Sequence, residues 1–498
     1  MASSEDIEEL KAKRLCYHCV GEVYLRAEMQ RQGRRGQCSY CNRRAKSYTI
    51  GDLAERIEEV FEQHFRRTSD QPSSWQQTLL SDRESTYEWE RDGEPVVQAI
   101  ANAADMPEEA AEDIQTILDD EHGDFDSAAV GEETEFSSES YYEEKGASDH
   151  AWQEEWRSFE RSLKTEARFF SRTAAAHLAS VFAGIDAMSA TDGRPLVLGA
   201  GPGTTLSAIY RARVFQSDDK LEASLCRPDQ HLGSPPASLA SAGRMNARGI
   251  AVFYGANEPG VAIAEVRPPV GSQVAVARFS IIRPLRLLDL TALSAVSEGG
   301  SIFDSALAGR LERAMFLRSR SQRITRPVMP DDEAFDYLPT QAVADFLATE
   351  NKPPIDGIAF PSVQAAGNAL NVVLFHKAAR VEALDIPDGT EIEASTGHTS
   401  EDGWEVDYSV IERTSPAEVP DGKDGDDGWP SLPVFAGNPW TSGDPDSREA
   451  TLRIDPDSVK VHIVRGVQFD SDEHKVRRHR WEKRDVGFEP GEDLSDKL

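Results

Sequence analysis

Four cysteines near the beginning of the chain have the spacing of a metal site. Cys16 and Cys19 form one C-x-x-C turn, and Cys38 and Cys41 form a second after a segment long enough for a hairpin or a short helix. Each turn places two sulfurs on one side of an ion, and four thiolates complete the tetrahedral shell that Zn²⁺ prefers. Because this shell leaves no open position, we expect a structural zinc ion. Two disulfides are the alternative, which a reducing compartment disfavours.

Other polar groups around these cysteines have less defined roles. His18 lies between two ligands and is expected to be a bystander, and Cys226 is expected to be a buried or inert thiol. A group of basic residues supports docking of a nucleic acid or a protein partner: Arg26, Arg31, Arg34, Arg35, Arg43, Arg44 and Lys46. We favour the alternative of a solvated basic face, or of a contact with the chain's own acidic segment, because the rest of the chain is strongly anionic.

Three runs in the second half of the chain contain further residues that could do chemistry. They are AIYRARVF at 208–215, GRMNARGIAVFYGANEPGVAIAEVRPP at 243–269 and DGIAFPSVQAAGNALNVVLF at 356–375. From about Thr191 to about Trp481, the chain resembles the RES family, which is named for an arginine, a glutamate and a serine recurring in this order. The preceding region, with CYHCVGEVYL, CSYC and WRSFERSLKTEARFF, resembles the HEPN-like helical region found before some RES domains.

The resemblance assigns the three characteristic residues to positions in this chain. The arginine falls on Arg211, with Arg213 as a close competitor, the glutamate on Glu265 and the serine on Ser362. RES domains are similar in fold to ADP-ribosyltransferases, and characterised members are toxins that destroy NAD. The resemblance therefore implies an enzyme that takes NAD as its substrate, either a glycohydrolase or phosphorylase-like enzyme or an ADP-ribosyltransferase.

Two further family positions lie between the arginine and the glutamate. The second arginine of the family, in its G-R-W-N stretch, corresponds to Arg244 of GRMN, and its tyrosine corresponds to Tyr254 of VFYGA. Met245 replaces the usual tryptophan of that stretch. This departure concerns the expected local packing and leaves the assignment of the charged and aromatic positions unchanged.

These residue types suit cleavage of the bond between nicotinamide and ribose. Positive charge develops on the ribose, so a fixed carboxylate such as Glu265 stabilises the transition state more than the ground state. Arg211 and Arg244 can hold the NAD diphosphate by forked, charge-assisted hydrogen bonds. Tyr254 can stack on the nicotinamide or its ribose, while Ser362 can bind the ribose or orient the carboxylate.

Two readings of the function other than NAD degradation stay open. Transfer of ADP-ribose to a macromolecule breaks the same bond, and a non-catalytic binding or immunity module would keep the pocket without the reaction. An antitoxin or another regulatory protein is an expected partner class for a toxin or defence effector. We do not expect nucleic acid as a partner except through the basic segment around the cysteines.

Two other motifs resemble functional ones. GAGPG at 199–203 has the glycines of a dinucleotide-binding turn, but a β-rich run follows it instead of a helix, so we expect an ordinary turn. Arg172 and His177 have the R-x4-H spacing of some helical ribonucleases. Because this spacing is short and common, we expect both residues to belong to a structural helix.

The periodicity of apolar residues predicts an α+β architecture. Ile50 to Phe65 should form an amphipathic helix, and residues 105–149 an acidic, flexible or loosely helical segment. Residues 152–182 should form one long buried helix whose apolar stripe includes Phe170. After Gly193, a mixed sheet is predicted by the short β-rich runs RPLVLGAG, LSAIYRARVF, GIAVFYGA, QVAVARFSII and GIAFPSV. Beyond Asp385 we expect turn-rich acidic loops and one late β candidate, SVKVHIVRGVQF, which could return to this sheet. The expected domains are a zinc ribbon with a helix at 1–70, an acidic and helical HEPN-like region at 71–190, an ADP-ribosyltransferase-like RES domain at 191–481 and a tail at 482–498.

Composition limits the classes of partner. The chain has 498 residues and a formal charge of −33, which repels nucleic acids and anionic membranes on average, so binding to either would need a local basic patch. No apolar run is long enough for a membrane helix, and the start MASSEDIEELKAKR has no apolar segment behind its charges. We therefore expect a cytoplasmic protein without a membrane partner.

Overall fold

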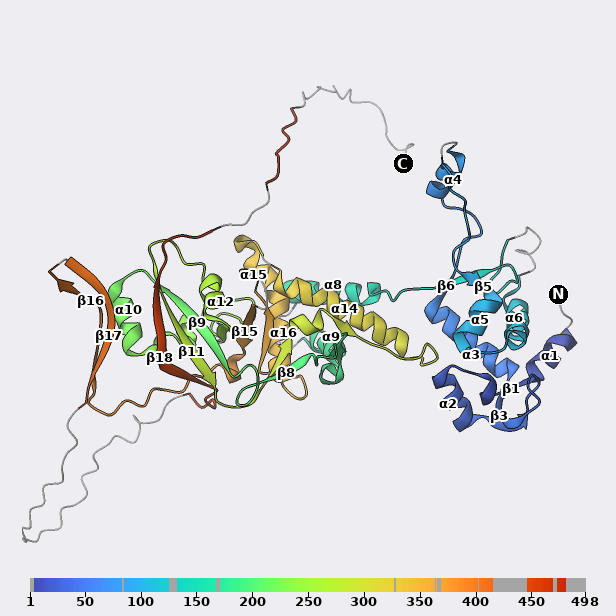
Figure 1. Cartoon of the computed structure of the whole chain (residues 1–498), viewed down its shortest axis with the longest axis horizontal. Coiled ribbons are helices and arrows are strands. Elements are labelled where there is room, and N and C mark those ends of the chain that lie inside the picture. Colours follow the sequence, from blue (N-terminus) through green and yellow to red (C-terminus); the bar gives the residue numbers. More distant parts are fainter. Residues whose placement is uncertain are drawn as a thin grey trace, which may run out of the picture.

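The protein consists of a smaller N-terminal unit and a larger unit built on one sheet, seen at opposite ends of the molecule in Figure 1. The computed structural model describes residues 4–82, 85–124, 132–166, 171–326, 328–362, 364, 369–401, 403–414, 446–468 and 473–480. Within these ranges, no helix combines the length and the apolar character that crossing a membrane requires.

In the N-terminal unit, helices surround a small sheet. The strands of this sheet follow the order β1-β3-β2, and a second small sheet has the order β4-β6-β5. The strands are β1 (Arg14–Cys16), β2 (Arg34–Gln37), β3 (Arg44–Thr49), β4 (Phe65–Arg67), β5 (Glu94–Pro95) and β6 (Tyr141–Glu144). The helices are α1 (Ser4–Ala12), α2 (Val23–Gln32), α3 (Ile50–His64), α4 (Ser74–Ser81), α5 (Val96–Ala104) and α6 (Glu108–His122).

The structure confirms the amphipathic helix predicted after the cysteines. In α3, the side chain of Thr49 accepts a hydrogen bond from the Asp52 amide, and the Asp52 carboxylate accepts one from the Thr49 amide. This capping box fixes the beginning of the helix because it satisfies amide groups that have no partner inside the helix. The apolar stripe from Ile50 to Phe61 then packs into the core of the N-terminal unit.

The prediction of a flexible or loosely helical acidic segment missed a well-packed helix at residues 108–122. These residues form α6, whose Ala110, Ile114 and Leu118 are fully buried against α3 and α5. The many carboxylates occupy the other face of this helix, so acidic composition concealed an apolar stripe at helical spacing. Strand β6 also lies in the predicted segment, whereas residues 125–131 lie outside the described ranges. The buried clusters group α5 and α6 with the cysteine-containing sheet, and the domain boundaries stay a prediction.

The larger unit is built on the mixed sheet that the sequence predicted. Its strand order is β18-β11-β9-β10-β15-β14-β12-β8, in which β12 and β14 are parallel and the other neighbours are antiparallel. The late β-rich run returns as the edge strand β18, as expected. The strands are β8 (Val197–Ala200), β9 (Ala208–Phe215), β10 (Phe253–Ala256), β11 (Gln273–Ile281), β12 (Leu285–Asp289), β14 (Gly357–Pro361), β15 (Leu370–Leu374) and β18 (Leu452–Ile463).

Smaller elements complete this unit. The glycine run at 199–203 is the expected turn, because β9 follows it and Gly201 adopts a φ of +127° close to the Arg283 carbonyl. The hairpin of β16 and β17 was missed, since its exposed, polar sequence was read as acidic loops. The elements are β7 (Ser189–Ala190), β13 (Val296–Ser297), β16 (Glu391–Ser400), β17 (Gly403–Arg413), α10 (Asp218–Cys226), α11 (Pro228–His231), α12 (Pro259–Glu265), α13 (Leu290–Leu293) and α15 (Glu333–Asp336).

The prediction of one long helix at 152–182 was wrong, because the segment forms two helices that pack together. Helix α8 (His150–Thr165) ends where Glu166 leaves helical geometry, and Ser171 begins α9 (Arg172–Phe182) by accepting a hydrogen bond from the Ala174 amide. Phe170, expected in the apolar stripe, lies outside the described residues. Arg172 is exposed, whereas His177 packs between Trp156 and Phe159, so the R-x4-H pair forms no joint site.

One long helix connects the two units. Helix α14 (Leu307–Thr325) packs against α8, and α16 (Leu338–Thr349) packs against both α8 and α9. Just before α14, the Phe303 side chain is fully buried in the core of the N-terminal unit, and its carbonyl accepts a hydrogen bond of 2.6 Å from Arg56 of α3. At the opposite end of α14, Thr325 lines the pocket described below.

Candidate active site

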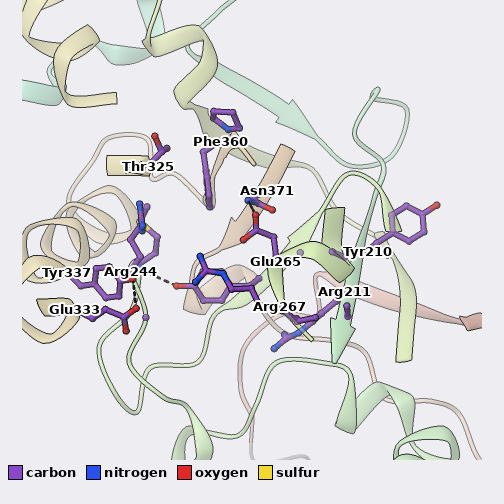
Figure 2. A pocket seen from close by; sticks show the side chains of 18 of the residues that line it. Tyr210, Arg211, Arg244, Glu265, Arg267, Thr325, Glu333, Tyr337, Phe360 and Asn371 are labelled. Carbon is purple, nitrogen blue, oxygen red and sulfur yellow. Dashed lines mark hydrogen bonds between the residues drawn. The ribbon is translucent and has the colours of Figure 1, made fainter. Parts of the chain in front are cut away.

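A cavity of about 480 Å³ opens between the sheet, α12 and the end of α14. Figure 2 shows its charged and aromatic side chains converging from these elements. Its lining residues are Tyr210, Arg211, Ala212, Ala242, Gly243, Arg244, Met245, Tyr254, Gly255, Ala262, Glu265, Val266, Arg267, Thr325, Glu333, Tyr337, Phe360, Pro361 and Asn371. The cavity therefore brings together residues that lie up to about a third of the chain apart in sequence.

The Glu265 carboxylate is held in the cavity wall by two hydrogen bonds. Helix α12 ends at Glu265, and the Oε1 atom accepts one bond from Ser362 Oγ and one from Asn371 Nδ2, each 2.7 Å long. Within the described residues, Oε2 accepts no hydrogen bond. One oxygen thus fixes the orientation of the carboxylate, and the other is left for a ligand.

Arg211 brings a positive charge to the same cavity from the middle of β9. Its guanidinium lies 4.9 Å from the Phe253 ring, and the buried Nη1 atom has no hydrogen-bond partner within the described residues. Burial, with a smaller contribution from the nearby Arg213, lowers the pKa of Arg211 to about 10, so the group stays charged at neutral pH. A buried cation without a counterion is costly, so this geometry favours an anionic ligand.

Arg244 and Tyr254 form a second wall of the cavity. Arg244 Nη1 donates a bond of 2.5 Å to the Ile324 carbonyl near the end of α14, and the guanidinium lies 5.5 Å from the Tyr337 ring. The Tyr254 hydroxyl donates to Asn246 Oδ1 and accepts from an amide, while its side chain remains 37% exposed. Burial raises the pKa of Tyr254 to about 12, so this residue is a neutral, rigid surface.

The structure separates Arg213 from the other candidate residues. Its side chain is exposed and donates a 2.5 Å hydrogen bond to the His231 carbonyl, and it does not line the cavity. Arg211 and Arg213 lie two positions apart on β9, but only Arg211 lines the cavity. Of the two arginines proposed for the same role, Arg211 therefore has the suitable position.

Several lining residues were not predicted from the sequence. Asn371 is buried in β15 and holds Glu265, although its strand lies more than a hundred residues further along the chain. Arg267 follows the glutamate by two positions and has a φ of +44°, a conformation that a non-glycine residue seldom adopts. Tyr337 and Phe360 add aromatic surface. The proximity of Arg267 to the family glutamate was the one signal that could have identified it.

The four cysteines of the two C-x-x-C turns come together in the N-terminal unit. Their sulfur atoms all lie within 4.8 Å of one another, and no two of them form a disulfide. The Sγ atoms of Cys16 and Cys41 are 3.5 Å apart, and those of Cys16 and Cys19 are 3.8 Å apart. A tetrahedron with zinc–sulfur bonds of about 2.3 Å has edges of about 3.8 Å. The four cysteines are therefore close enough to bind one metal ion.

The two bystander predictions are consistent with the structure. His18 stacks on Tyr17 with a ring separation of 4.0 Å and is not part of the cysteine cluster. Cys226 lies at the end of α10, far from the cluster in sequence, where its thiol contacts the Ile392 carbonyl. Burial raises the pKa of the Cys226 thiol, which favours the unreactive protonated form.

Two family models match this chain and together cover both units. One describes a HEPN/RES N-terminal domain 1 and matches residues 31–177, and the other describes a RES domain and matches residues 210–395. Residues 210–395 therefore match a RES domain, and residues 31–177 before them match a HEPN/RES N-terminal domain. The second match includes Arg211, Arg244, Tyr254, Glu265 and Ser362. No curated protein and no solved structure matches the chain, so the expected likeness to ADP-ribosyltransferases stays a prediction.

Proposed function

We propose that the RES domain is an NAD-degrading enzyme that cleaves the bond between nicotinamide and ribose and acts as a toxin or defence effector. The RES family is associated with NAD-related toxin systems. The observation that carries the proposal is the pairing, in one cavity, of an oriented carboxylate at Glu265 with the Arg211 guanidinium, whose buried Nη1 atom has no hydrogen-bond partner among the described residues. NAD offers the matching groups, a cationic nicotinamide–ribose centre and an anionic diphosphate.

The carboxylate acts on the reacting ribose. As nicotinamide leaves, its bonding electron pair goes with it and positive charge develops on the ribose ring. The free Oε2 atom of Glu265 stabilises this charge, while Ser362 and Asn371 hold Oε1 and so prevent the carboxylate from rotating away. Because the carboxylate is oriented before the substrate arrives, little reorganisation accompanies the reaction.

The arginines and the tyrosine bind the unreactive parts of NAD. Arg211 meets the diphosphate with a guanidinium that otherwise has no counterion in the described part of the chain. Arg244 is oriented by the Ile324 carbonyl and the Tyr337 ring and can present its remaining N–H groups to a second phosphate oxygen. The exposed face of Tyr254 offers a stacking surface for the nicotinamide or its ribose.

An assay of the products distinguishes the proposed reaction from its alternatives. The purified chain is incubated with NAD, with and without inorganic phosphate, and nicotinamide and the ADP-ribose products are measured. Free ADP-ribose indicates transfer to water, and a phosphorylated ADP-ribose indicates transfer to phosphate. Label that appears on a macromolecule would favour an ADP-ribosyltransferase. Binding of NAD without any release of nicotinamide would favour the non-catalytic module.

The cysteine cluster has a separate proposed role. We propose that it holds a structural zinc ion, because four thiolates close the coordination shell and leave no site for a substrate. The cluster belongs to the N-terminal unit, whereas the residues proposed to act on NAD belong to the sheet of the larger unit. An antitoxin or regulatory protein is the proposed partner class of the whole chain.

Replacing Arg244 by lysine is expected to impair NAD turnover mainly through substrate binding. A point charge would replace a planar fork, so KM should rise by about tenfold, which corresponds to about 1.4 kcal/mol, while kcat should fall less. Steady-state kinetics would measure both constants. Arg248→Lys is the matched control because Arg248 is exposed and lies outside the cavity. Equal effects of the two substitutions would contradict a specific contact by Arg244.

Replacing Ser362 by alanine is expected to lower kcat by about tenfold with little change in KM. The loss corresponds to about 1.4 kcal/mol, in the range of one hydrogen bond to a charged group, and Asn371 would still hold Oε1. A double-mutant cycle tests this positioning role. In a Glu265→Gln background, Ser362→Ala should have a much smaller effect, because the carboxylate that it orients is already gone. If Ser362→Ala had the same effect in both backgrounds and raised KM, Ser362 would instead bind the ribose.

A further inference from the structure

The basic residues around the cysteines lie on the surface of the N-terminal unit. Arg26 and Arg31 belong to α2, Arg34 and Arg35 to β2, and the remaining two arginines lie at or just before the start of β3. All six are exposed: Arg26, Arg31, Arg34, Arg35, Arg43 and Arg44. We call these six residues the arginine face. Across the described ranges, none of them forms a salt bridge within 4.0 Å.

Among the described residues, the chain's own acidic segment forms no salt bridge with the arginine face. Asp113 of α6 pairs with Lys13 at 2.7 Å, and Glu121 pairs with Lys11 at 2.8 Å. Glu133 pairs with Arg91, also at 2.7 Å. These three carboxylates therefore form salt bridges with basic residues outside the arginine face. An intramolecular contact with the acidic segment was one reading of the basic cluster, and the observed pairs leave the arginine face available for another molecule.

The β2–β3 hairpin fixes how these charges are presented. In its antiparallel register, Arg35 is opposite Lys46, and Gln37 is opposite Arg44, so these four positions share one face of the hairpin. Arg34 is opposite Ser47 and lies on the other side of the hairpin, so the arginine face includes residues from both sides. Lys46 is used internally, because its Nζ donates to the carbonyls of Gln30 and Arg31 at the end of α2. The outward-facing side chains of the hairpin are therefore arginines, and the planar guanidinium group matches the geometry of phosphate oxygens.

We propose that the arginine face binds the phosphate backbone of double-stranded nucleic acid without reading its sequence. In a chain of net charge −33, six arginines that form no salt bridge among the described residues indicate a strongly anionic partner. Strands β2 and β3 belong to the three-stranded sheet β1-β3-β2, and α2 packs beside β3. Guanidinium groups on this sheet and on α2 would therefore contact phosphates on the outside of the duplex.

Fluorescence anisotropy with labelled duplexes of about two helical turns would test the proposal on the full chain. The variant carries Arg34→Gln, Arg35→Gln, Arg43→Gln and Arg44→Gln. The control carries Arg157→Gln, Arg161→Gln, Arg172→Gln and Arg248→Gln, which removes four exposed arginines outside the arginine face and gives the same net charge. The affinity of the variant is expected to fall by at least 100-fold, and the control should bind like the wild type.

The salt dependence gives a second measure. The slope of log affinity against log salt should become shallower by about 0.9 for each lost phosphate contact to DNA, or by about 3 to 4 for the fourfold variant. Metal content and thermal melting would show that the variant is folded, and the pairs Arg34→Gln with Arg35→Gln and Arg43→Gln with Arg44→Gln serve if it is not. Equal losses in variant and control would overturn the proposal. So would wild-type binding to an acidic peptide or to anionic vesicles but not to a DNA or RNA duplex.

Discussion

Replacing Glu265 by alanine is expected to lower the rate of nicotinamide release by about 10²–10³-fold. Loss of a positioned group that stabilises transition-state charge costs about 3–4 kcal/mol, and no other carboxylate accepts the bonds of Ser362 and Asn371 within the described residues. The measurement is the initial rate of nicotinamide release from NAD. In cells that express the chain, the same substitution should abolish depletion of NAD.

Glu265→Gln separates the role of charge from the role of shape. Glutamine keeps an acceptor oxygen for Ser362 and Asn371 but carries no negative charge, so its turnover should fall nearly as far as that of the alanine variant. NAD binding by both variants, measured by calorimetry, should change much less than turnover, and thermal melting should be close to that of the wild type. Wild-type turnover in either variant would refute the assignment of this site.

Replacing Cys38 by serine is expected to abolish metal binding and to unfold the N-terminal unit. Cys38 is fully buried, and its sulfur accepts a hydrogen bond from the Cys16 amide, so the residue belongs to the metal cluster and to the core. A structural zinc ion contributes about 10–16 kcal/mol of apparent binding free energy near neutral pH, more than the stability of most small domains. The measurements are metal content by mass spectrometry, with about one zinc ion per wild-type chain, and melting with and without a chelator.

Cys226→Ser is the matched control for this experiment, because Cys226 is a free thiol outside the cluster. It should retain its zinc and its melting curve. The hydrogen bonds of Glu265 involve no residue of the N-terminal unit, so they should survive the loss of zinc. Freshly prepared wild-type protein that contains no zinc, or a Cys38→Ser variant that melts like the wild type, would contradict a structural metal site.

The sheet was predicted well because β-rich runs bounded by turn residues can be recognised from the local sequence alone. The runs that became β9, β10, β11 and β14 were recognised in this way, and β18 was recognised as a late return to the sheet. The predictions of secondary structure failed where another feature of the sequence obscured the true spacing of the apolar residues. In α6, acidic composition concealed the buried stripe through Ile114, and between α8 and α9 the apolar pattern continued across a break that Ser171 caps.

The candidate site was predictable to the extent that its residues have family positions. Ser362 was expected either to bind the ribose or to orient Glu265, and the structure shows the hydrogen bond between them. Asn371 could not be found in this way, because its contact with Glu265 depends on how β15 pairs beside β10 and not on local spacing. The choice between Arg211 and Arg213 likewise needed the position of the cavity along β9.

The position of α14 has a thermodynamic consequence. At about 1.5 Å per residue, its 19 residues span about 28 Å. One end is tied to the N-terminal core through Phe303, and an ion pair of 2.9 Å between Arg310 and Asp304 braces the intervening loop. The other end supplies the carbonyl that orients Arg244. Under the proposed function, a ligand of the N-terminal unit that displaces Phe303 is expected to change the affinity for NAD, and reciprocity would then require NAD to change the affinity for that ligand by the same factor.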